Sequence, residues 1–293
     1  MILIVGCGYL GGYLVKEISH KTGEPIVATL RDYRKNVPGL SARYVYCDVT
    51  DRESLKKLSE ICSGQELTVF YLASAHNVDY VFENPEEARK INVGGLKSFF
   101  EAFPKVRKLF YASTDCVYGE GKGLCGKLSE ASPLNPINEY GRQKIEAEEI
   151  VIEKGFTVLR FPFMLGPSLS ERPHFYDRIC DSLLKGDSPE LIDGMHRSVI
   201  SFSQAAELMY RLSLCEKLPQ IINVCADSAL SKYDVGCVLA KKLGVGENRM
   251  KKISEAEGES FFKDKRASFV SMDNTLIKSL LGLEEIKWEE EIC

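Results

Sequence analysis

The sequence has few of the residues and spacings that mark metal-binding or disulfide-bonded proteins. It contains only 4 histidines in 293 residues, and His76, His174 and His196 have none of the spacings typical of metal ligands. Its 10 cysteines form no C-x-x-C pair, and several lie inside or beside apolar runs, where cysteine behaves as a small hydrophobic residue. We therefore expect no metal, and a reduced, cytoplasmic location.

Long apolar runs and clusters of one charge are missing as well. No run approaches the roughly 20 apolar residues of a transmembrane helix, and residues 1–5 are too short for the apolar core of a secretory signal. The formal net charge is -4, without the clustered basic face that nucleic-acid-binding proteins present. We expect neither a membrane nor a nucleic acid as a partner.

What the sequence does contain is a regular alternation of short apolar runs with helical segments. Pro85 begins a helical segment that ends before Pro104, and another covers 139–153 and stops at Gly155. The apolar runs, rich in β-branched residues, lie at 2–5, 26–30, 44–46, 68–72, 108–112, 156–161 and 221–224. This alternation predicts an α/β fold with a doubly wound parallel sheet and helices on both of its faces.

A glycine-rich turn follows the first apolar run and opens a helical segment. It reads Gly6-Cys7-Gly8-Tyr9-Leu10-Gly11. Glycines permit a tight turn and a close backbone approach, and the free N–H groups of a helix N-terminus suit a pyrophosphate. The turn therefore predicts a Rossmann-type dinucleotide site that includes Gly6, Gly8, Tyr9, Leu10 and Gly11.

The end of the second apolar run bears on the choice of cofactor. Asp32 would accept hydrogen bonds from a free ribose 2′-hydroxyl, whereas Arg31 would pair with a 2′-phosphate. Arg31 comes first, and Arg34 and Lys35 add positive charge nearby, so we favour NADP, with NAD as the alternative. Asp48, after the third run, is a candidate acceptor for the adenine amino group, or else a residue at a helix N-terminus.

The regular alternation breaks after Phe161, where prolines and glycines become frequent. We predict a dinucleotide-binding Rossmann domain at 1–165, to which residues 196–225 return. A smaller, irregular substrate-binding region is predicted at 166–195 and 226–293. From about Ala226 onward we expect helices and loops.

Tyr140 and Lys144 lie four residues apart in a helical segment, so both face the same side. A nearby cation favours the phenolate and lowers the pKa of a tyrosine, which suits the phenol to proton transfer near neutral pH. Tyrosine and lysine at this spacing are common on exposed helices. Here the pair follows both the glycine-rich turn and Ser113-Thr114 at the end of an apolar run, which favours a catalytic interpretation.

Taken together, these stretches resemble the extended short-chain dehydrogenase/reductases, the family of nucleotide-sugar epimerases, dehydratases and reductases, over nearly the whole chain. The matching stretches are Tyr71-Leu72-Ala73-Ser74-Ala75, Asn92-Val93-Gly94-Gly95, the run from Ala112 to Gly119, Tyr140 to Lys144, and Arg160 with Gly166-Pro167. One departure is that Val5 stands where the first glycine of the family's G-x-x-G-x-x-G falls.

The resemblance implies a role for each matching residue. Tyr140 would be the proton donor or acceptor, Lys144 would bind the nicotinamide ribose, and Thr114 would hold the substrate oxygen, with Ser113 structural. Arg197 would grip a substrate diphosphate, for which a guanidinium is well shaped. Further substrate contacts are expected at Arg266 and His76, and further cofactor contacts at Asp48, Val49, Leu72, Ala73, Ser74, Asn92 and Phe161.

The residue after Thr114-Asp115 bears on the reaction. Dehydratases of this family carry Thr-Asp-Glu, but Cys116 stands in place of the glutamate, and Ser113-Thr114-Asp115-Cys116-Val117 is similar to the S-T-D-x-V of dTDP-4-dehydrorhamnose-type reductases. We expect NADPH-dependent reduction of a 4-keto group on a nucleotide-diphosphate sugar. The alternatives are an epimerase that retains NAD and a non-catalytic NADP-binding regulatory protein. The resemblance also implies a homodimer that pairs through the helical segments at about 86–103 and 139–153.

Overall fold

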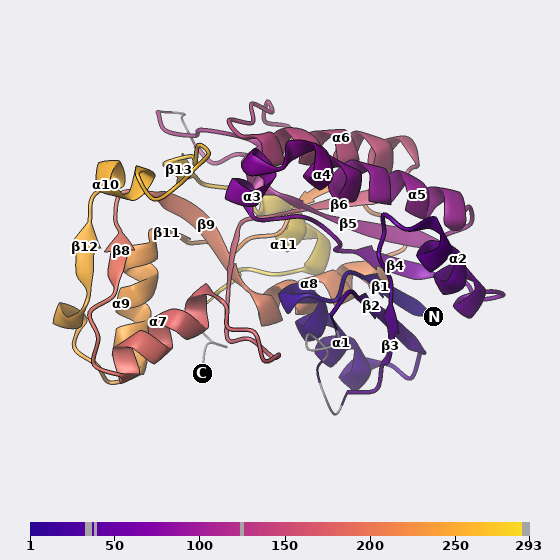
Figure 1. Cartoon of the computed structure of the whole chain (residues 1–293), viewed down its shortest axis with the longest axis horizontal. Coiled ribbons are helices and arrows are strands. Elements are labelled where there is room, and N and C mark those ends of the chain that lie inside the picture. The colour runs from indigo at the N-terminus through magenta and orange to yellow at the C-terminus, as the bar shows by residue number, and fades with distance from the viewer. Residues whose placement is uncertain (33–36, 38–39, 124–125, 289–293) are drawn as a thin grey trace.

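The structure, a computed structural model, describes residues 1–32, 37, 40–123 and 126–288 (Figure 1). Its main element is a seven-stranded parallel sheet in the order β10-β6-β5-β4-β1-β2-β3. The strands are β1 (Ile2–Val5), β2 (Ile26–Leu30), β3 (Arg43–Tyr46), β4 (Thr68–Tyr71), β5 (Lys108–Thr114), β6 (Thr157–Phe161) and β10 (Ile221–Asn223). The predicted doubly wound parallel sheet is confirmed.

The order of the strands creates the place where a ligand can bind. From β1 the chain proceeds to β2 and β3 on one side, then crosses to β4, β5 and β6 on the other. Loops that follow β1 and β4 therefore diverge and leave a crevice at the carboxyl edge of the sheet. Every residue of β1, β2, β4 and β6 is buried, as expected for strands covered on both faces.

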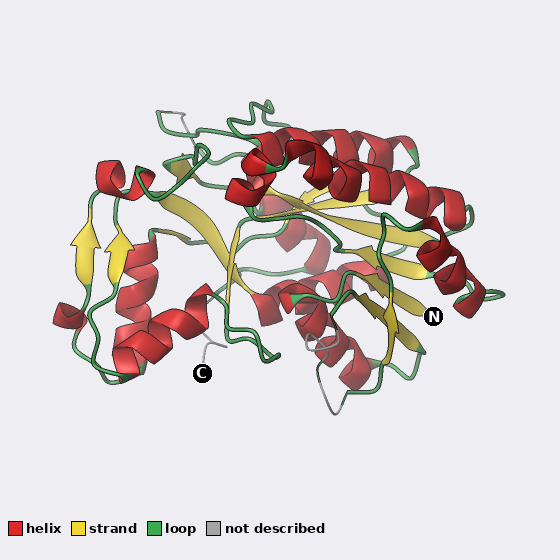
Figure 2. Cartoon of the chain, viewed as in Figure 1, coloured by secondary structure: helices red, strands yellow, loops and turns green. Residues whose placement is uncertain are grey.

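Helices cover both faces of this sheet (Figure 2). One face packs on α1 (Tyr9–Lys21), α8 (Phe202–Leu214) and α11 (Thr275–Leu281). The other packs on α2 (Arg52–Ile61), α5 (Gly95–Ala102) and α6 (Glu139–Glu153). Alongside α6 lie α3 (Val78–Glu83), α4 (Pro85–Arg89) and the π-helical segment η2 (Lys90–Gly94). A short 3-10 turn, η3 (Asp115–Val117), follows β5.

The remaining elements lie to one side of the main sheet, at the left of Figure 1. A second sheet contains β7 (Phe163–Leu165), β9 (His196–Ser201), β11 (Ala229–Leu230) and β13 (Phe269–Val270). Strands β8 (Glu190–Ile192) and β12 (Lys251–Ile253) form a two-stranded sheet. The helices here are α7 (Phe175–Leu184), α9 (Lys232–Lys242), η4 (Glu247–Arg249) and α10 (Glu255–Glu259).

Three details differ from the sequence-based prediction. The C-terminal part contains short strands as well as the expected helices and loops. Strand β9, inside the segment 196–225, belongs to the second sheet, and the return to the main sheet begins with α8 and ends with β10. The helical segment from Pro85 has a π-helical turn in its middle, a feature often found at functional sites. The division into a dinucleotide domain and a substrate region stays a prediction.

Phe99 and Phe100 lie on different sides of α5. Phe99 is fully buried between Tyr71 and Phe103, whereas Phe100 is half-buried and stacks on Phe156 at 5.8 Å between ring centroids. Phe100 is therefore partly covered within the chain. The homodimer that pairs through residues 86–103, which form α4, η2 and α5, and through α6 stays a prediction.

Within the described residues, the structure has no helix that combines the length and the apolar character needed to cross a membrane.

Candidate functional site

The glycine-rich turn has the shape that a dinucleotide requires. Gly6 has φ +91°, and a Cβ atom there would lie 2.5 Å from the backbone nitrogen of Ala73, so only glycine fits. A Cβ atom at Gly8 would meet nothing within 4 Å, because this residue faces open space. Helix α1 begins directly after Gly8, with no side chain capping its N-terminal N–H groups. The turn thus offers an open cradle of backbone donors to an anionic group.

A cavity of about 580 Å³ extends from this turn along the carboxyl edge of the sheet. It brings together thirteen of the predicted site residues, which come from six separate parts of the chain. They are Gly6, Gly8, Tyr9, Leu10, Gly11, Leu72, Ser74, His76, Thr114, Tyr140, Lys144, Phe161 and Arg197. The glycine-rich turn and the Tyr140/Lys144 pair therefore line the same cavity, which is the arrangement that chemistry on a bound dinucleotide requires.

The residues predicted to contact the adenosine end lie outside this cavity lining. The side chain of Arg31 is half exposed, and its Nη1 lies 3.8 Å from Oδ2 of Asp48. Asp48 also accepts hydrogen bonds from the backbone N–H and the hydroxyl of Thr50, at 2.9 and 2.7 Å, and these bonds together with Arg31 lower its pKa despite the opposing effect of burial. The N-cap of α2 is Asp51. Arg34 and Lys35 fall outside the described residues.

Val49, Ala73 and Asn92, also predicted to contact the cofactor, are not among the cavity-lining residues either. Val49 is buried in the core against Gly95, and Ala73 packs on Gly6. Asn92, in the π-helical turn, is buried and holds the loop after β4: its Oδ1 accepts from Ser74 Oγ at 2.9 Å and from the Ala75 N–H at 2.8 Å. Their direct contact with a cofactor stays a prediction, whereas their support of the cavity wall is visible.

The electrostatics of Tyr140 and Lys144 differ from the sequence-based expectation. Lys144 is buried, donates to the carbonyl oxygen of Ala112 at 2.6 Å, and lies 4.1 Å from the ring centroid of Tyr111. Burial lowers its pKa to about 7, against a smaller opposing effect of Glu148. Burial likewise raises the pKa of Tyr140, and a hydrogen bond with Ser74 only partly offsets this. The expected lowering of the tyrosine pKa is wrong for this structure, because desolvation of the charged forms dominates.

Thr114 and Ser113 lie side by side in sequence and point to different environments. Thr114 lines the cavity, and its hydroxyl donates to Oδ1 of Asp115 at 3.2 Å and accepts from the N–H of Cys116 at 3.3 Å. The hydroxyl of Ser113 donates to the buried carboxylate of Glu148. This contact agrees with the structural role expected for Ser113, and the substrate contact of Thr114 stays a prediction.

Arg197 reaches the cavity from strand β9, but a carboxylate already neutralises it. Its Nε donates to Oδ2 of the buried Asp115 at 3.0 Å, and its Nη2 donates to Oδ1 of the same side chain. Nη2 also lies 3.4 Å from Sγ of Cys116. The pKa of Arg197 is raised by Asp115 although burial opposes this. A substrate diphosphate would therefore meet a paired arginine, and that contact stays a prediction.

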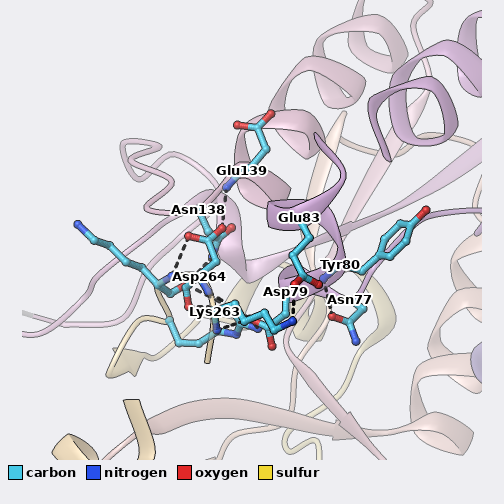
Figure 3. A network of polar contacts seen from close by, with 10 residues as sticks. Asn77, Asp79, Tyr80, Glu83, Asn138, Glu139, Lys263 and Asp264 are labelled. Atoms are coloured by element: carbon cyan, nitrogen blue, oxygen red, sulfur yellow. Dashed lines mark hydrogen bonds and ion pairs between the residues drawn. The ribbon is translucent and has the colours of Figure 1, made fainter. Parts of the chain in front are cut away.

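Arg266 takes part in a polar network between the C-terminal part and helix α6. Its Nη2 lies 3.0 Å from Oδ1 of Asp79, and the same carboxylate accepts from the N–H groups of Lys263 and Asp264. Asp264 in turn accepts from the backbone N–H of Glu139, the first residue of α6 (Figure 3). Arg266 does not line the cavity, and its contact with a phosphate stays a prediction.

Two lining residues, Cys116 and His174, have no role predicted from the sequence. Cys116 was noted only as a replacement for glutamate, yet it lies beside Arg197 in the cavity wall. His174, at the N-terminus of α7, packs edge-on against Tyr9 and Phe202 at 4.7 and 5.1 Å between ring centroids. Burial lowers its pKa to about 4. Neither position has a sequence signal, because both contacts join segments far apart in the chain.

One group of side chains has the composition of a metal site. Ligand atoms of Asp193, His196 and Asp234 lie within 4.8 Å of one another. The carboxylates already have partners, however: Asp193 pairs with Lys252 at 2.9 Å, and Asp234 accepts from the N–H and hydroxyl of Ser231, both at 2.8 Å, as part of the capping box of α9. Internal hydrogen bonds therefore account for this group, and the expectation that the protein needs no metal stays a prediction.

Comparison with known proteins supplies the family. The UDP-glucose 4-epimerase of Lactobacillus helveticus is 27% identical over 213 residues, which cover 66% of this chain and 63% of that protein, so the match spans less than two thirds of its length. The methionine adenosyltransferase 2 subunit beta of Rattus norvegicus is 20% identical over 264 residues, which cover 87% of this chain and 75% of that protein.

Among solved structures, a hypothetical dTDP-4-dehydrorhamnose reductase from Sulfolobus tokodaii superposes with a TM-score of 0.79 at 21% identity, covering 98% of this chain and 97% of that one. At this identity the likeness shows the shared fold. The family model described as "NAD dependent epimerase/dehydratase family" matches residues 2–225, which confirms the resemblance inferred from the sequence motifs. The chain belongs to the NAD dependent epimerase/dehydratase family.

Proposed function

We propose that this protein is an NAD(P)-dependent oxidoreductase that acts on a nucleotide-diphosphate sugar, and that it reduces a 4-keto group with Tyr140 as the proton donor. The observation that carries the proposal is the single cavity that joins the open glycine-rich turn to Thr114, Tyr140 and Lys144. A carbonyl that receives a hydride develops negative charge on its oxygen. A hydroxyl that binds this oxygen and an acid that protonates it are therefore the groups required.

The residues present fit the cofactor that the family implies. Backbone N–H groups at the start of α1 would hold its pyrophosphate, and Lys144 would hold its nicotinamide ribose. When bound, the cofactor supplies the hydride. Thr114 would donate a hydrogen bond to the substrate oxygen, and Tyr140 would hold its phenolic proton until that oxygen becomes basic. Phe161 and Leu72 form apolar parts of the wall that limit access of water.

The direction of the reaction is supported by the protonation state of Tyr140. Because burial raises the pKa of its phenol, Tyr140 is protonated at neutral pH, as a proton donor in a reduction must be. Cys116 in place of the dehydratase glutamate supports the same assignment, because no carboxylate follows Asp115 to remove a sugar C5 proton. Arg31, half exposed at the end of β2, supports NADP as the cofactor.

Replacement of Tyr140 by phenylalanine tests the catalytic assignment. Tyr140→Phe should lower the turnover of a 4-keto nucleotide sugar by about 10²-fold or more, because it removes only the group that carries the proton. Cofactor affinity, measured by fluorescence titration, should stay within about twofold. A phenylalanine variant with nearly the turnover of the wild type would exclude Tyr140 as the proton donor.

An epimerase with retained NAD is the second candidate, favoured by the similarity to a UDP-glucose 4-epimerase. An epimerase returns its hydride to the same substrate and so keeps its cofactor, whereas a reductase must exchange it. The nicotinamide absorbance of freshly purified protein, recorded before and after denaturation, separates the two. Stoichiometric NAD released only on denaturation would favour the epimerase.

A non-catalytic NADP-binding regulatory protein is the third candidate. The similarity to a subunit of methionine adenosyltransferase favours it. The proton-transfer groups argue against it, because both Tyr140 and Lys144 are retained and both line the cavity. A protein that binds NADPH but turns over no keto sugar, with Tyr140→Phe unchanged in every assay, would favour this candidate.

A further inference from the structure

Arg197, Arg266 and Lys232 are three cations in the same region of the protein, and within the described residues only the two arginines form an ion pair with a carboxylate. Arg197 pairs with Asp115 and Arg266 pairs with Asp79. Lys232 is half-buried, and the described residues offer it no ion pair or hydrogen bond. Its Nζ instead lies over two aromatic rings, 5.5 Å from the ring centroid of Phe175 and 5.2 Å from that of Phe262. No oxygen atom of the described residues therefore accepts a hydrogen bond from the Lys232 ammonium.

This lack of a partner is unusual for an interior lysine in this protein. Lys278 pairs with Asp227 at 2.8 Å, and Lys108 donates to two backbone carbonyl oxygens, at 2.8 and 2.6 Å. Cation–π contacts repay only part of the hydration that an ammonium loses on burial. Lys232 also occupies the first position of α9, the helix end at which a positive charge is unfavourable. Its position therefore costs free energy, which the Asp79 carboxylate offsets only in part and without a hydrogen bond or ion pair to the ammonium.

The strand pairing brings Lys232 close to both arginines. Arg197 pairs in register with Leu230, two residues before Lys232, and with Val270, four residues after Arg266. The ring of Phe262 lies under the Lys232 ammonium and also 4.9 Å from the Arg266 guanidinium. Burial, followed by repulsion from Arg197 and Arg266, lowers the pKa of Lys232 against a smaller opposing effect of Asp79. Three cations therefore share one region with two carboxylate partners.

This region adjoins the cavity. Arg197 lines the cavity wall, and Phe175, which contacts Lys232, packs edge-on against the lining residue Phe163 at 5.4 Å between ring centroids. Suppose that the reacting carbon of the substrate lies at Thr114 and Tyr140. An anionic group on the same substrate would then extend toward Arg197. A phosphate there would supply the oxygen acceptors that the Lys232 ammonium lacks.

We propose that Lys232 provides the unneutralised positive charge that binds a phosphate group of the substrate beside Arg197. This inference rests on the proposed function and names a residue that determines its specificity for substrates with a diphosphate. The ligand class is a nucleoside diphosphate linked to the reacting sugar. Inorganic pyrophosphate has the same phosphate chemistry without the nucleoside.

Calorimetric titrations with UDP and dTDP, in the presence of saturating NADP, test the proposal. Saturating NADP keeps the probes away from the glycine-rich turn. Lys232→Met keeps most of the side-chain length and removes the charge. It should lower the affinity for the nucleoside diphosphate that the wild type binds by about 10- to 100-fold, as expected for loss of a charge-assisted hydrogen bond. Lys232→Arg should stay within about fivefold of the wild type. Lys241→Met, an exposed position on the same helix, is the matched control and should match the wild type.

Thermal unfolding without nucleotide separates a binding role from a structural one. If Lys232 serves to bind phosphate and its positive charge destabilises the nucleotide-free protein, Lys232→Met should melt at or above the temperature of the wild type. The reason is that the substitution removes the repulsion from two arginines. If the cation–π contacts are structural, it should melt lower. A variant that melts lower and binds the nucleoside diphosphate as the wild type does would overturn the proposal.

The outcomes also separate this inference from the proposed function. Unchanged nucleotide affinity in Lys232→Met, with clear binding to the wild type, overturns the inference and leaves the nucleotide-sugar assignment standing. If the wild type binds pyrophosphate but neither UDP nor dTDP, and Lys232→Met loses pyrophosphate, the phosphate role of Lys232 is supported and the nucleotide-sugar assignment fails. If the wild type binds none of the three probes, the inference is overturned.

Discussion

A buried ion pair between β6 and α6 allows the sharpest prediction on stability. Arg160 on β6 and Glu148 on α6 have side chains that are each 2% exposed, and Nη2 of the arginine lies 2.6 Å from Oε2 of the glutamate. Arg160 Nε adds a contact of 3.0 Å to Oε1, and its Nη1 donates to the hydroxyl of Tyr118 at 3.0 Å. Glu148 also accepts from Ser113. Every charge in this cluster is thus paired inside the protein.

Removal of one partner should cost far more than removal of both. Arg160→Met leaves a buried carboxylate without its cation, and we expect a loss of about 3–5 kcal/mol in the free energy of unfolding. Glu148→Leu leaves the guanidinium buried and should cost a similar amount. In the double variant no charge remains, and the main penalty is the unpaired Ser113 hydroxyl, about 1–3 kcal/mol. The double variant should therefore be at least as stable as either single variant.

Urea unfolding at pH 7, followed by far-UV circular dichroism, measures these values, and equal m-values would show that the variants unfold from the same compact state. The double-mutant cycle should give a coupling of about 3 kcal/mol or more between the two positions. Additive losses, with the double variant less stable than either single one, would refute the reasoning. They would mean that water or another group satisfies each charge by itself.

Two further predictions concern Lys144 and Arg31. Because the pKa of Lys144 is lowered from 10.5 to about 7, the unfolded chain binds more protons than the folded one between these values. The free energy of unfolding of the cofactor-free protein should therefore rise with pH from 7 to 8.5, by up to about 1.4 kcal/mol per pH unit from this group. Lys144→Met should flatten that rise and the exposed Lys97→Met should not, and equal slopes in all three proteins would contradict the buried state of Lys144. Arg31→Ala should weaken NADPH binding by about 1–3 kcal/mol and leave NADH nearly unchanged. Calorimetry with both cofactors measures this, and equal losses would shift the weight to Asp32 and NAD.

The sequence was sufficient to predict the main sheet because its strands carry strong local signals. Strand β1 is a continuous apolar run that ends at Gly6, and β2 is an apolar run with one threonine between Pro25 and Arg31. Both strands are buried on both faces. Strands β7, β8 and β9 were not predicted. The first two have three residues each, too few to show a period. Strand β9 begins with His196 and Arg197, which interrupt its apolar pattern, and of these Arg197 lines the cavity.

The candidate site was predictable where a motif encodes local geometry. Gly6 with its positive φ, and Tyr140 with Lys144 on one helix face, are examples. The partners of charged residues were not predictable. Asp115 and Arg197 are 82 residues apart, and nothing in either local sequence indicates the other. The same reason explains the wrong expectation for the pKa of Tyr140, since spacing along a helix reports a neighbour and does not report burial.

The pairing of Arg197 with Asp115 changes how the phosphate site should be tested. Asp115 is 1% exposed, so an arginine that left it to bind phosphate would abandon a buried carboxylate, at a cost of several kcal/mol. Arg197 must therefore stay paired when substrate binds, and the pair offers a diphosphate little net charge. Replacement of Arg197 by alanine would remove a phosphate contact and destabilise the cavity wall together, so a loss of binding could not be assigned to either. Lys232 has no hydrogen bond or ion pair to a carboxylate among the described residues, so its variants test the phosphate contact without taking the paired cation from a buried carboxylate.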